Sequence, residues 1–316
     1  MNLILSEYLG TLASIRPKRQ VNTEKQRMTR RYAAQSLIPL CVAFVCVASL
    51  APRLSAQEGK PLAPSVGLQE FFAKVLSSPS SPPPSQDLHK LTLELAHAPS
   101  QEIARGLSSV FAALGLQDEN SKAYACAALF AIARREDGAD LLRLHVSAIG
   151  SDLLSTNLSN IRAGEIEILG AIRPSPPPEA VSILLEFVRR DSPEAQSLGA
   201  GVIFQLIQIA PDDPRVIQAI QEFLSRATLD RGTKIAALNA VGNLRVKNHQ
   251  IEVTVTSFLS DSDQDVRTAA IRVVTRMGRR ALELAEPALL RLANDPAQPE
   301  QVRKEANRAL GISNEP

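Results

Sequence analysis

The sequence predicts an all-α protein built as a solenoid of helix pairs, and three observations support this prediction. A template in which a basic or amide anchor is followed by small or aliphatic residues at +3, +6 and +7 occurs six times. The anchors are separated by 40, 34, 38, 33 and 36 residues, a period typical of helical repeats that bury their apolar faces against neighbouring units. The 316 residues are 45% hydrophobic but only 4% aromatic, which favours closely packed helices over sheets.

The N-terminal region is expected to be a targeting segment and not part of the folded body. Residues 1–27 have no helical period and are interpreted as an extension from an early start, because Met28 begins a signal sequence of its own. Within 28–56, arginines precede the apolar run Ser36–Ala51 and Ala56 precedes a polar stretch, as in a secretory signal peptide cleaved after Ala56. The alternative is an uncleaved anchor, since the run approaches the roughly 20 residues that span a bilayer. Both readings place the body outside the cytoplasm, in a periplasmic or extracellular location.

The net charge is different when residues 1–56 are left out. Eight basic and two acidic residues lie in 1–56, which leaves 27 basic and 31 acidic residues beyond Ala56, a net charge of −4. A body with that balance has no general electrostatic attraction to nucleic acid, so no nucleic-acid partner is predicted. Cys126 is the one cysteine beyond Ala56, and no intramolecular disulfide is expected.

The body is predicted to follow a tether. Residues 57–85 are rich in Pro and Ser and predict a disordered tether, with at most a short helix over 68–76. Over 86–313, segments such as Val181–Val188 and Ala285–Leu292 have apolar residues at i, i+3, i+4 and i+7, which predicts the first helix of each pair. The template supplies the second helix; its anchors are Lys122, Arg162, Gln196, Lys234, Arg267 and Arg303.

Cap residues mark where these helices begin and end. Ser192 and Asp213 each precede a proline, so their side chains are expected to accept hydrogen bonds from the first turn of a helix. Gly242, Gly278 and Gly311 follow second helices and are expected to close them in the left-handed conformation.

The C-terminal units carry a family resemblance. Val302–Gly311, after Leu289–Pro296, resembles a HEAT repeat of the bacterial type, in which a Leu-rich helix ending in Asp-Pro leads into Val-Arg-x-x-Ala-x-x-Ala-Leu-Gly. Asp263–Ala270 and Ile161–Gly170 are similar, and the resemblance covers roughly residues 100–312. It implies a right-handed superhelix of antiparallel helix pairs whose second helices line a concave, protein-binding surface.

The same resemblance implies an inter-repeat ladder in which basic anchors bridge to acids in adjoining turns. The residues assigned to the ladder are Arg162, Lys234, Arg267, Arg303, Asp263 and Asp295. The pattern is not uniform, because Gln196 replaces a basic anchor and Glu165 occupies a position where the family has Ala.

No residue pattern predicts catalysis, a cofactor or a metal site. His89 and His97, with Glu94 between them, lie eight residues apart and do not share a helix face well. Cys126 lies among alanines without a neighbouring base, and neither a nucleophile elbow nor a phosphate loop occurs. These features favour a protein that is not an enzyme.

One group of basic residues is a candidate for partner binding. Arg272, Arg276, Arg279 and Arg280 follow the anchor of the fifth unit and form a basic run that an acidic patch on a partner would fit. The competing interpretation is a solvated surface that pairs with its own acids, since Asp261, Asp263 and Asp265 lie at the other end of the segment.

The predicted function is an exported, non-enzymatic scaffold that binds a protein partner through the concave surface. One alternative is a structural subunit or spacer of an envelope assembly. A second is an enzyme similar to the bilin lyases, because some HEAT-like proteins have that activity. A membrane is expected as a partner only through an uncleaved N-terminal segment.

Overall fold

The computed structural model describes residues 67–77, 85–172, 176–242 and 248–312. All of them belong to one compact unit, Val66–Pro316. The predicted extension 1–27 and the signal peptide or anchor at 28–56 lie outside the described residues. In the ranges that are described, no helix combines the length and the apolar character needed to cross a membrane.

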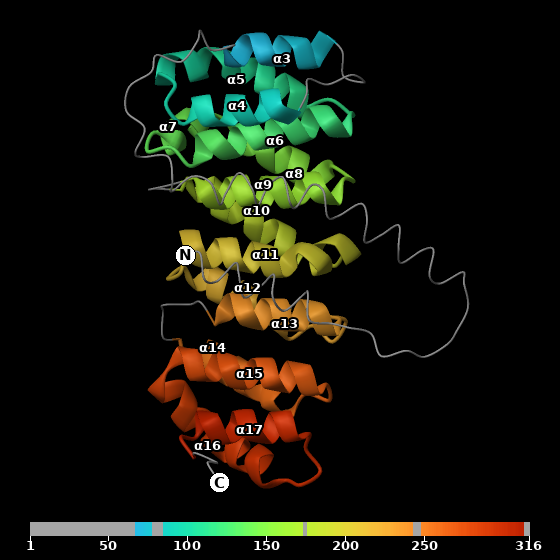
Figure 1. The fold of residues 1–316 in the computed structure, drawn as a ribbon, viewed down its shortest axis with the longest axis vertical. Coiled ribbons are helices and arrows are strands. Elements are labelled where there is room, and N and C mark those ends of the chain that lie inside the picture. The colour runs from blue at the N-terminus through green and yellow to red at the C-terminus, as the bar shows by residue number, and fades with distance from the viewer. Residues whose placement is uncertain (1–66, 78–84, 173–175, 243–247, 313–316) are drawn as a thin grey trace, which may run out of the picture. The chain divides into compact units, whose positions relative to one another are not determined.

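The helices of this unit stack in two rows that follow the chain (Figure 1). The first-helix row contains α3 (Leu68–Ser77), α5 (Ser100–Leu114), α8 (Val146–Ser155), α10 (Pro178–Arg189), α12 (Pro214–Leu224), α14 (His249–Ser257) and α16 (Arg279–Asn294). The second-helix row contains α4 (Ser85–Leu95), α6 (Glu119–Ala133), α9 (Ser159–Ala171), α11 (Pro193–Ile209), α13 (Arg231–Val241), α15 (Gln264–Met277) and α17 (Glu300–Ala309). The short elements are α7 (Gly138–Leu142), η2 (Arg143–His145) and η3 (Phe258–Ser260).

Contacts between helices run along each row and across each pair. In the second-helix row α6 packs on α9, α9 on α11, α11 on α13, α13 on α15 and α15 on α17. In the first-helix row α8, α10, α12, α14 and α16 pack in the same sequential way, and α7 takes the place beside α5. This nearest-neighbour arrangement is that of an all-α solenoid of helix pairs, as the repeat period predicts.

The template positions form the core of the second-helix row. The residue at +3 is buried in all six units and is small in five of them, which lets the helices approach closely. The +6 and +7 residues are buried from α6 through α15 and become partly exposed at Ala309 and Leu310 of α17, the last helix.

The predicted caps are largely confirmed. The Ser192 hydroxyl accepts a hydrogen bond from the Ala195 amide at 3.1 Å, and the Asp213 carboxylate accepts one from the Arg215 amide at 2.8 Å. Gly278 and Gly311 have the expected positive φ, at 96° and 71°.

The prediction for Gly242 is wrong, since its φ of −61° is right-handed. A Cβ at Gly242 would lie 2.9 Å from Nη2 of Arg276, so glycine serves here to admit a neighbouring side chain.

The short helix that was allowed within the predicted tether over 57–85 is present, whereas residues 57–66 and 78–84 lie outside the described residues. Residues 68–77 form the ten-residue helix α3, whose apolar side chains Leu68, Phe71, Phe72 and Val75 are buried. α3 packs on α5, and α4 packs on α6. The solenoid therefore begins one helix pair before the first copy of the template.

Candidate functional site

The second-helix row presents one accessible position in every unit. The residue five places after each anchor is exposed or partly exposed in all six units, in contrast to the buried +3 position. On α11 the neighbouring position at +8 is Phe204, which is 36% exposed although it is large and apolar. We define the second-helix face as Phe204 together with the +5 residues Ala127, Glu167, Gly201, Asn239, Arg272 and Arg308.

The four arginines of the predicted binding group do not share one surface. Arg272 and Arg276 lie on α15 in the second-helix row, whereas Arg279 and Arg280 begin α16 in the first-helix row. The backbone reversal at Gly278, with its positive φ, separates the two pairs. Of the four, only Arg272 belongs to the second-helix face, and Arg276 lies one turn further along the same helix.

Each of these arginines also has a partner within the chain. Nη2 of Arg272 lies 2.6 Å from Oε1 of Glu305 on α17 and Nη2 of Arg276 lies 2.8 Å from Oδ1 of Asn239 on α13, so α15 is tied to both neighbours. On α16, the Nε of Arg279 is 2.7 Å from Glu283 and the Nε of Arg280 is 3.2 Å from Oε2 of Glu252. The geometry therefore agrees with the self-paired interpretation, while Arg272 remains about half exposed, at 54%.

Of the basic residues assigned to the ladder, Lys234 makes an ionic contact between units, and the anchor Lys122, which was not assigned to it, makes another. Lys122 of α6 lies 2.6 Å from Oδ2 of Asp152 on α8, and Lys234 of α13 lies 2.9 Å from Oδ2 of Asp261, which follows η3. In both cases an anchor on one second helix reaches the end of the first helix in the next pair. Each contact therefore links successive units of the solenoid.

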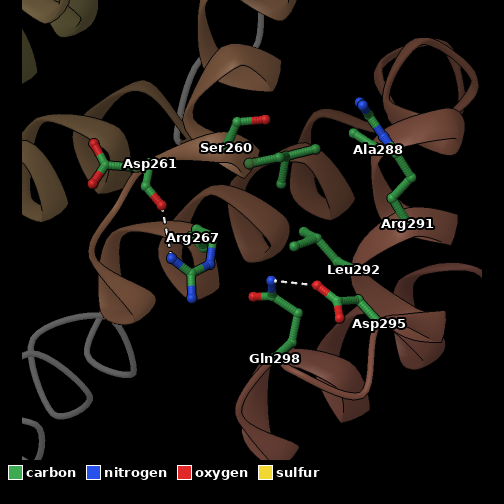
Figure 2. A pocket seen from close by; sticks show the side chains of 9 residues that line it. Ser260, Asp261, Arg267, Ala288, Arg291, Leu292, Asp295 and Gln298 are labelled. Carbon is green, nitrogen blue, oxygen red and sulfur yellow. Dashed lines mark hydrogen bonds between the residues drawn. The ribbon is translucent and has the colours of Figure 1, made fainter.

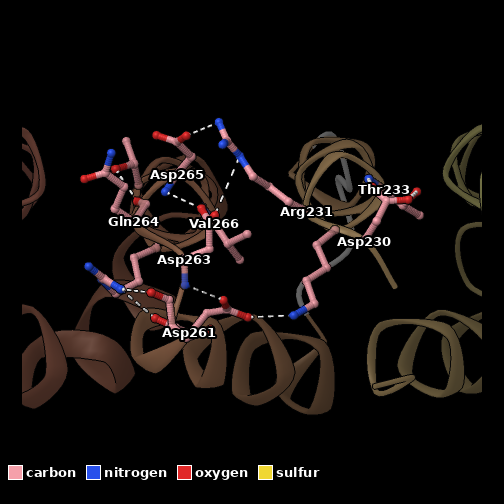
Figure 3. A network of polar contacts seen from close by, with 12 residues as sticks. Asp230, Arg231, Thr233, Asp261, Asp263, Gln264, Asp265 and Val266 are labelled. Atoms are coloured by element: carbon pink, nitrogen blue, oxygen red, sulfur yellow. Dashed lines mark hydrogen bonds and ion pairs between the residues drawn. The ribbon is translucent and has the colours of Figure 1, made fainter. Parts of the chain in front are cut away.

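The polar contacts of Asp261 and Asp263 differ from the prediction made for Arg267 (Figure 3). Nη1 of Arg267 donates to the backbone carbonyls of Asp261 at 2.7 Å and Ser262 at 3.0 Å, and not to the Asp263 carboxylate. The Asp263 carboxylate accepts hydrogen bonds from the Asp265 and Val266 amides, because the first turn of α15 needs acceptors for its free N–H groups. Its ionic neighbour is Arg231, whose Nε lies 3.8 Å away.

Arg303 and Arg162 likewise do not form the expected ionic rungs. Asp295 accepts hydrogen bonds from the Ala297 amide and from Nε2 of Gln298, both at 2.9 Å, and Arg303 acts on it only through its charge. Arg162 is 9% exposed and its guanidinium lies 6.0 Å from the centre of the Phe187 ring. An anchor arginine in this chain thus packs beside the adjoining unit without a carboxylate partner.

A second ladder was missed by the sequence reasoning. Three arginines reach back to carbonyls at or near the C-terminal end of the preceding helix in the same row, where backbone oxygens lack helical partners. Arg135 donates to the Leu95 carbonyl at 2.5 Å, Arg190 to the Leu154 carbonyl at 2.7 Å and Arg226 to the Val188 carbonyl at 2.8 Å. Arg190 and Arg226 are 36 residues apart, so the repeat period itself was the available signal.

A buried polar cluster lies between α6, α8 and α9. Lys122 is 3% exposed and pairs with Asp152, and Glu165 of α9 is wholly buried close to this pair. Burial, followed by the neighbouring carboxylate of Asp152, raises the pKa of Glu165 to about 10. The Glu165 carboxyl is therefore protonated at neutral pH.

The thiol of Cys126 borders the same cluster. It is 2% exposed, and burial is the main reason that its pKa lies well above the ordinary value. A protonated, enclosed thiol is a poor nucleophile. Within the described ranges, no three His, Cys, Asp or Glu side chains are arranged as metal ligands.

A cleft of ≈ 300 Å³ lies where η3, α15, α16 and the turn before α17 meet (Figure 2). Leu259, Ala288 and Leu292 supply apolar lining, and Arg267, Arg291 and Asp295 supply charges of both signs. Arg267 and Asp295 already hold backbone groups of adjoining turns, as described above. We interpret the cleft as a junction between two helix pairs.

No protein-family model and no curated protein matches the sequence. Among solved structures, an archaeal HEAT-like repeats protein from Thermococcus onnurineus NA1 is 16% identical with a TM-score of 0.47, over 80% of this chain and 98% of that one. An engineered protein is 18% identical with a TM-score of 0.33, over 78% of this chain and 95% of that one. The helix contacts and the repeated motif, taken together, make the described part of the chain an all-α solenoid that resembles HEAT-like repeat proteins.

Proposed function

We propose that the chain is an exported, non-enzymatic scaffold that binds a protein partner through its second-helix face. The observation that carries the proposal is the accessible +5 position, which recurs in register in six successive units. Stacked repeats with such a face offer an extended surface without requiring a deep pocket. The enclosed, protonated Cys126 thiol supports the non-enzymatic part of the proposal.

The centre of the second-helix face can be altered by a substitution that does not disturb the packing of the solenoid. Gly201 lies in the interior of α11, and a Cβ added there would meet nothing within 4 Å. Gly201→Glu therefore introduces bulk and charge beside Phe204 without a steric conflict inside the solenoid. Val253→Glu is the matched control, because Val253 is 47% exposed on α14 of the other row.

The test compares crosslinked partners of the parent and both variants in intact cells, identified by mass spectrometry. We expect Gly201→Glu to lose the partner and Val253→Glu to retain it, with equal urea midpoints for all three proteins. Equal partner recovery from both variants would remove the centre of the second-helix face from the proposal. The double variant R272E/R276E then tests whether the basic end of the face contributes.

Export has an independent test in the N-terminus of the protein isolated from cells. Cleavage after Ala56 predicts a mature chain that begins at Gln57, which mass spectrometry of the intact protein detects. An intact N-terminus in the membrane fraction supports the anchor instead. An intact N-terminus in the cytoplasmic fraction would contradict export.

A further inference from the structure

The cleft between η3, α15, α16 and the turn before α17 has the size of a site for a small molecule (Figure 2). Its volume of ≈ 300 Å³ lies at the lower end of the range of roughly 300–1,000 Å³ that is usual for ligand pockets. None of the residues that define the second-helix face lines this cleft. A ligand bound here is therefore separate from the protein partner proposed above.

Two buried polar atoms of the lining have no hydrogen-bond partner within the part of the chain that the structure describes. They are the Nε of Arg267 and the Oε1 of Gln298. Arg267 donates through its Nη1, and Gln298 donates through its Nε2 to Asp295. A buried polar atom costs free energy unless it is hydrogen-bonded. One donor and one acceptor in the cleft are thus available to a ligand.

The charged side chains of the lining differ in how fully they are used. The Asp261 carboxylate pairs with Lys234 on α13 at 2.9 Å, and Asp295 accepts hydrogen bonds from the turn before α17. The Arg291 side chain is exposed and makes no hydrogen bond or ion pair with any described residue. Figure 2 shows Arg267 and Arg291 on opposite sides of the cleft. Their unused N–H groups are suited to a carboxylate, which arginine binds with charge-assisted hydrogen bonds.

Apolar side chains form another part of the lining. Leu259 and Leu292 are 1% and 7% exposed, and Ala288 is partly buried. An aliphatic group placed against them leaves water, which is favourable. In Figure 2, Leu292 lies between Arg267 and Arg291. The cleft can therefore hold a carboxylate and an aliphatic group of the same small molecule.

We propose that this cleft binds a small aliphatic carboxylate that also carries an N–H donor, an aliphatic α-amino acid being the simplest example. Arg267 and Arg291 bind its carboxylate, and Oε1 of Gln298 accepts a hydrogen bond from its ammonium group. Leu292 contacts its aliphatic side chain. The Asp295 carboxylate lines the same cleft, so it attracts the ammonium group and disfavours a doubly charged anion such as phosphate.

The first test measures the binding of three probes to the full chain by isothermal titration calorimetry. Leucine carries all three groups, 4-methylpentanoate lacks the ammonium group and leucinamide lacks the carboxylate. We expect leucine to bind about tenfold more tightly than either of the others, because each of them loses a charge-assisted hydrogen bond. No binding of leucine at millimolar concentration would overturn the proposal, and so would equal affinities for the three probes.

A pair of arginine variants on α16 tests where the carboxylate is bound. Arg291→Met removes the guanidinium group from the cleft. Arg279→Met is the matched control, because Arg279 is 92% exposed on the same helix and does not line the cleft. We expect Arg291→Met to weaken leucine binding about tenfold and to leave leucinamide binding unchanged, while the control binds both as the parent does. Equal leucine affinities of the two variants would contradict the assignment of Arg291.

The variant Gln298→Met tests the acceptor for the ammonium group. We expect it to bind leucine no more tightly than 4-methylpentanoate, because only leucine uses the Oε1 acceptor. Its affinity for 4-methylpentanoate should equal that of the parent, which distinguishes a lost acceptor from a disordered cleft. Leucine should also shift the backbone amide NMR signals of residues 259–261 and 295–298 in the parent. A retained preference for leucine in Gln298→Met, or shifts confined to α11 and α13, would overturn the proposal.

Discussion

At the scale of single residues, Glu165 is the clearest departure from the repeat pattern. Its template position is small in the other five units, and here a carboxyl is enclosed beside the Lys122–Asp152 pair. An enclosed acid that keeps its proton must take one up whenever the chain folds from an ionised unfolded state. The stability of the chain is therefore expected to depend on pH through this residue.

Replacing Glu165 by glutamine should stabilise the protein in alkaline but not in acidic solution. The unfolded carboxyl ionises near pH 4.5 and the folded one near 10, so wild-type stability falls as pH rises between these values. Glutamine has no proton to take up, and its advantage should grow from pH 5 to pH 8 to at most about 4 kcal/mol. Urea unfolding of Glu165→Gln at both pH values measures it, with Glu179→Gln as an exposed control. An advantage independent of pH would contradict the expectation.

Lys122 should be among the most sensitive charged residues in the chain. Its ammonium group is buried, and removing it leaves the Asp152 carboxylate without its partner. Lys122→Met is therefore expected to lower the free energy of unfolding by about 3–5 kcal/mol. Lys304→Met is the control, because the Lys304–Glu300 pair is about 70% exposed and such pairs contribute little. Similar urea midpoints for both variants would show that the buried pair is dispensable.

The template residues were predicted in their burial but not in their hydrogen-bond and ionic partners. The period and the small +3 residues predicted which positions are buried. The partners of the anchors were not predictable, because Asp263 and Asp295 both precede second helices but serve the adjacent backbone. A carboxylate beside free backbone N–H groups accepts hydrogen bonds from them in preference to pairing with an arginine. A sequence pattern does not reveal which of the two partners the carboxylate takes.

At the scale of elements, helix ends determine how each pair is oriented. Asp230 closes the start of α13 by accepting the Thr233 amide at 3.0 Å and the Thr233 hydroxyl at 2.9 Å. The amide hydrogen bond, followed by the hydroxyl, lowers the pKa of Asp230. The cap thus stabilises the helix as long as its carboxyl is ionised.

Asp230→Ala should cost about 1 kcal/mol of stability at neutral pH, the usual value of an N-cap. Because the folded pKa is lowered, the contribution is present above the unfolded value of 3.8 and is lost as pH falls through the folded pKa. The difference between variant and parent should therefore shrink below pH 3. Thermal unfolding at pH 7 and pH 2.5 measures this difference. Asp212→Ala, in the loop before α12, is the control. A difference unchanged at low pH would show that ionisation of Asp230 does not matter.

The elements also explain why the packing of α3 and α4 onto the solenoid was not predicted. α3 lies within a segment whose prolines and serines dominate its composition, and α4 lacks the basic anchor and the small residues of the template. Their apolar residues become meaningful only against α5 and α6, which supply the surfaces they cover. Terminal units need one packed face instead of two, so they can depart from the repeat pattern.

At the scale of the whole described unit, the contacts are almost all between sequential neighbours. From α9 to α15, each helix packs on its pair mate and on the helices before and after it in the same row. Stability in such an array is a sum of local terms, so a local defect should remain local. The second-helix face can then lose order at one end while it stays intact at the other.

Leu289→Ala tests this locality directly. Leu289 is fully buried on α16, and its truncation should cost about 2–5 kcal/mol within the last pairs. Amide exchange is expected to accelerate in α14 to α17 and to stay unchanged in α8 to α10, because α11, α12 and α13 separate the two groups. Leu284→Ala on the same helix, where the side chain is 36% exposed, should change exchange little. Uniform acceleration across all helices would mean that the solenoid unfolds as one cooperative unit, and the ladders that join its pairs would then be strong enough to override the nearest-neighbour architecture.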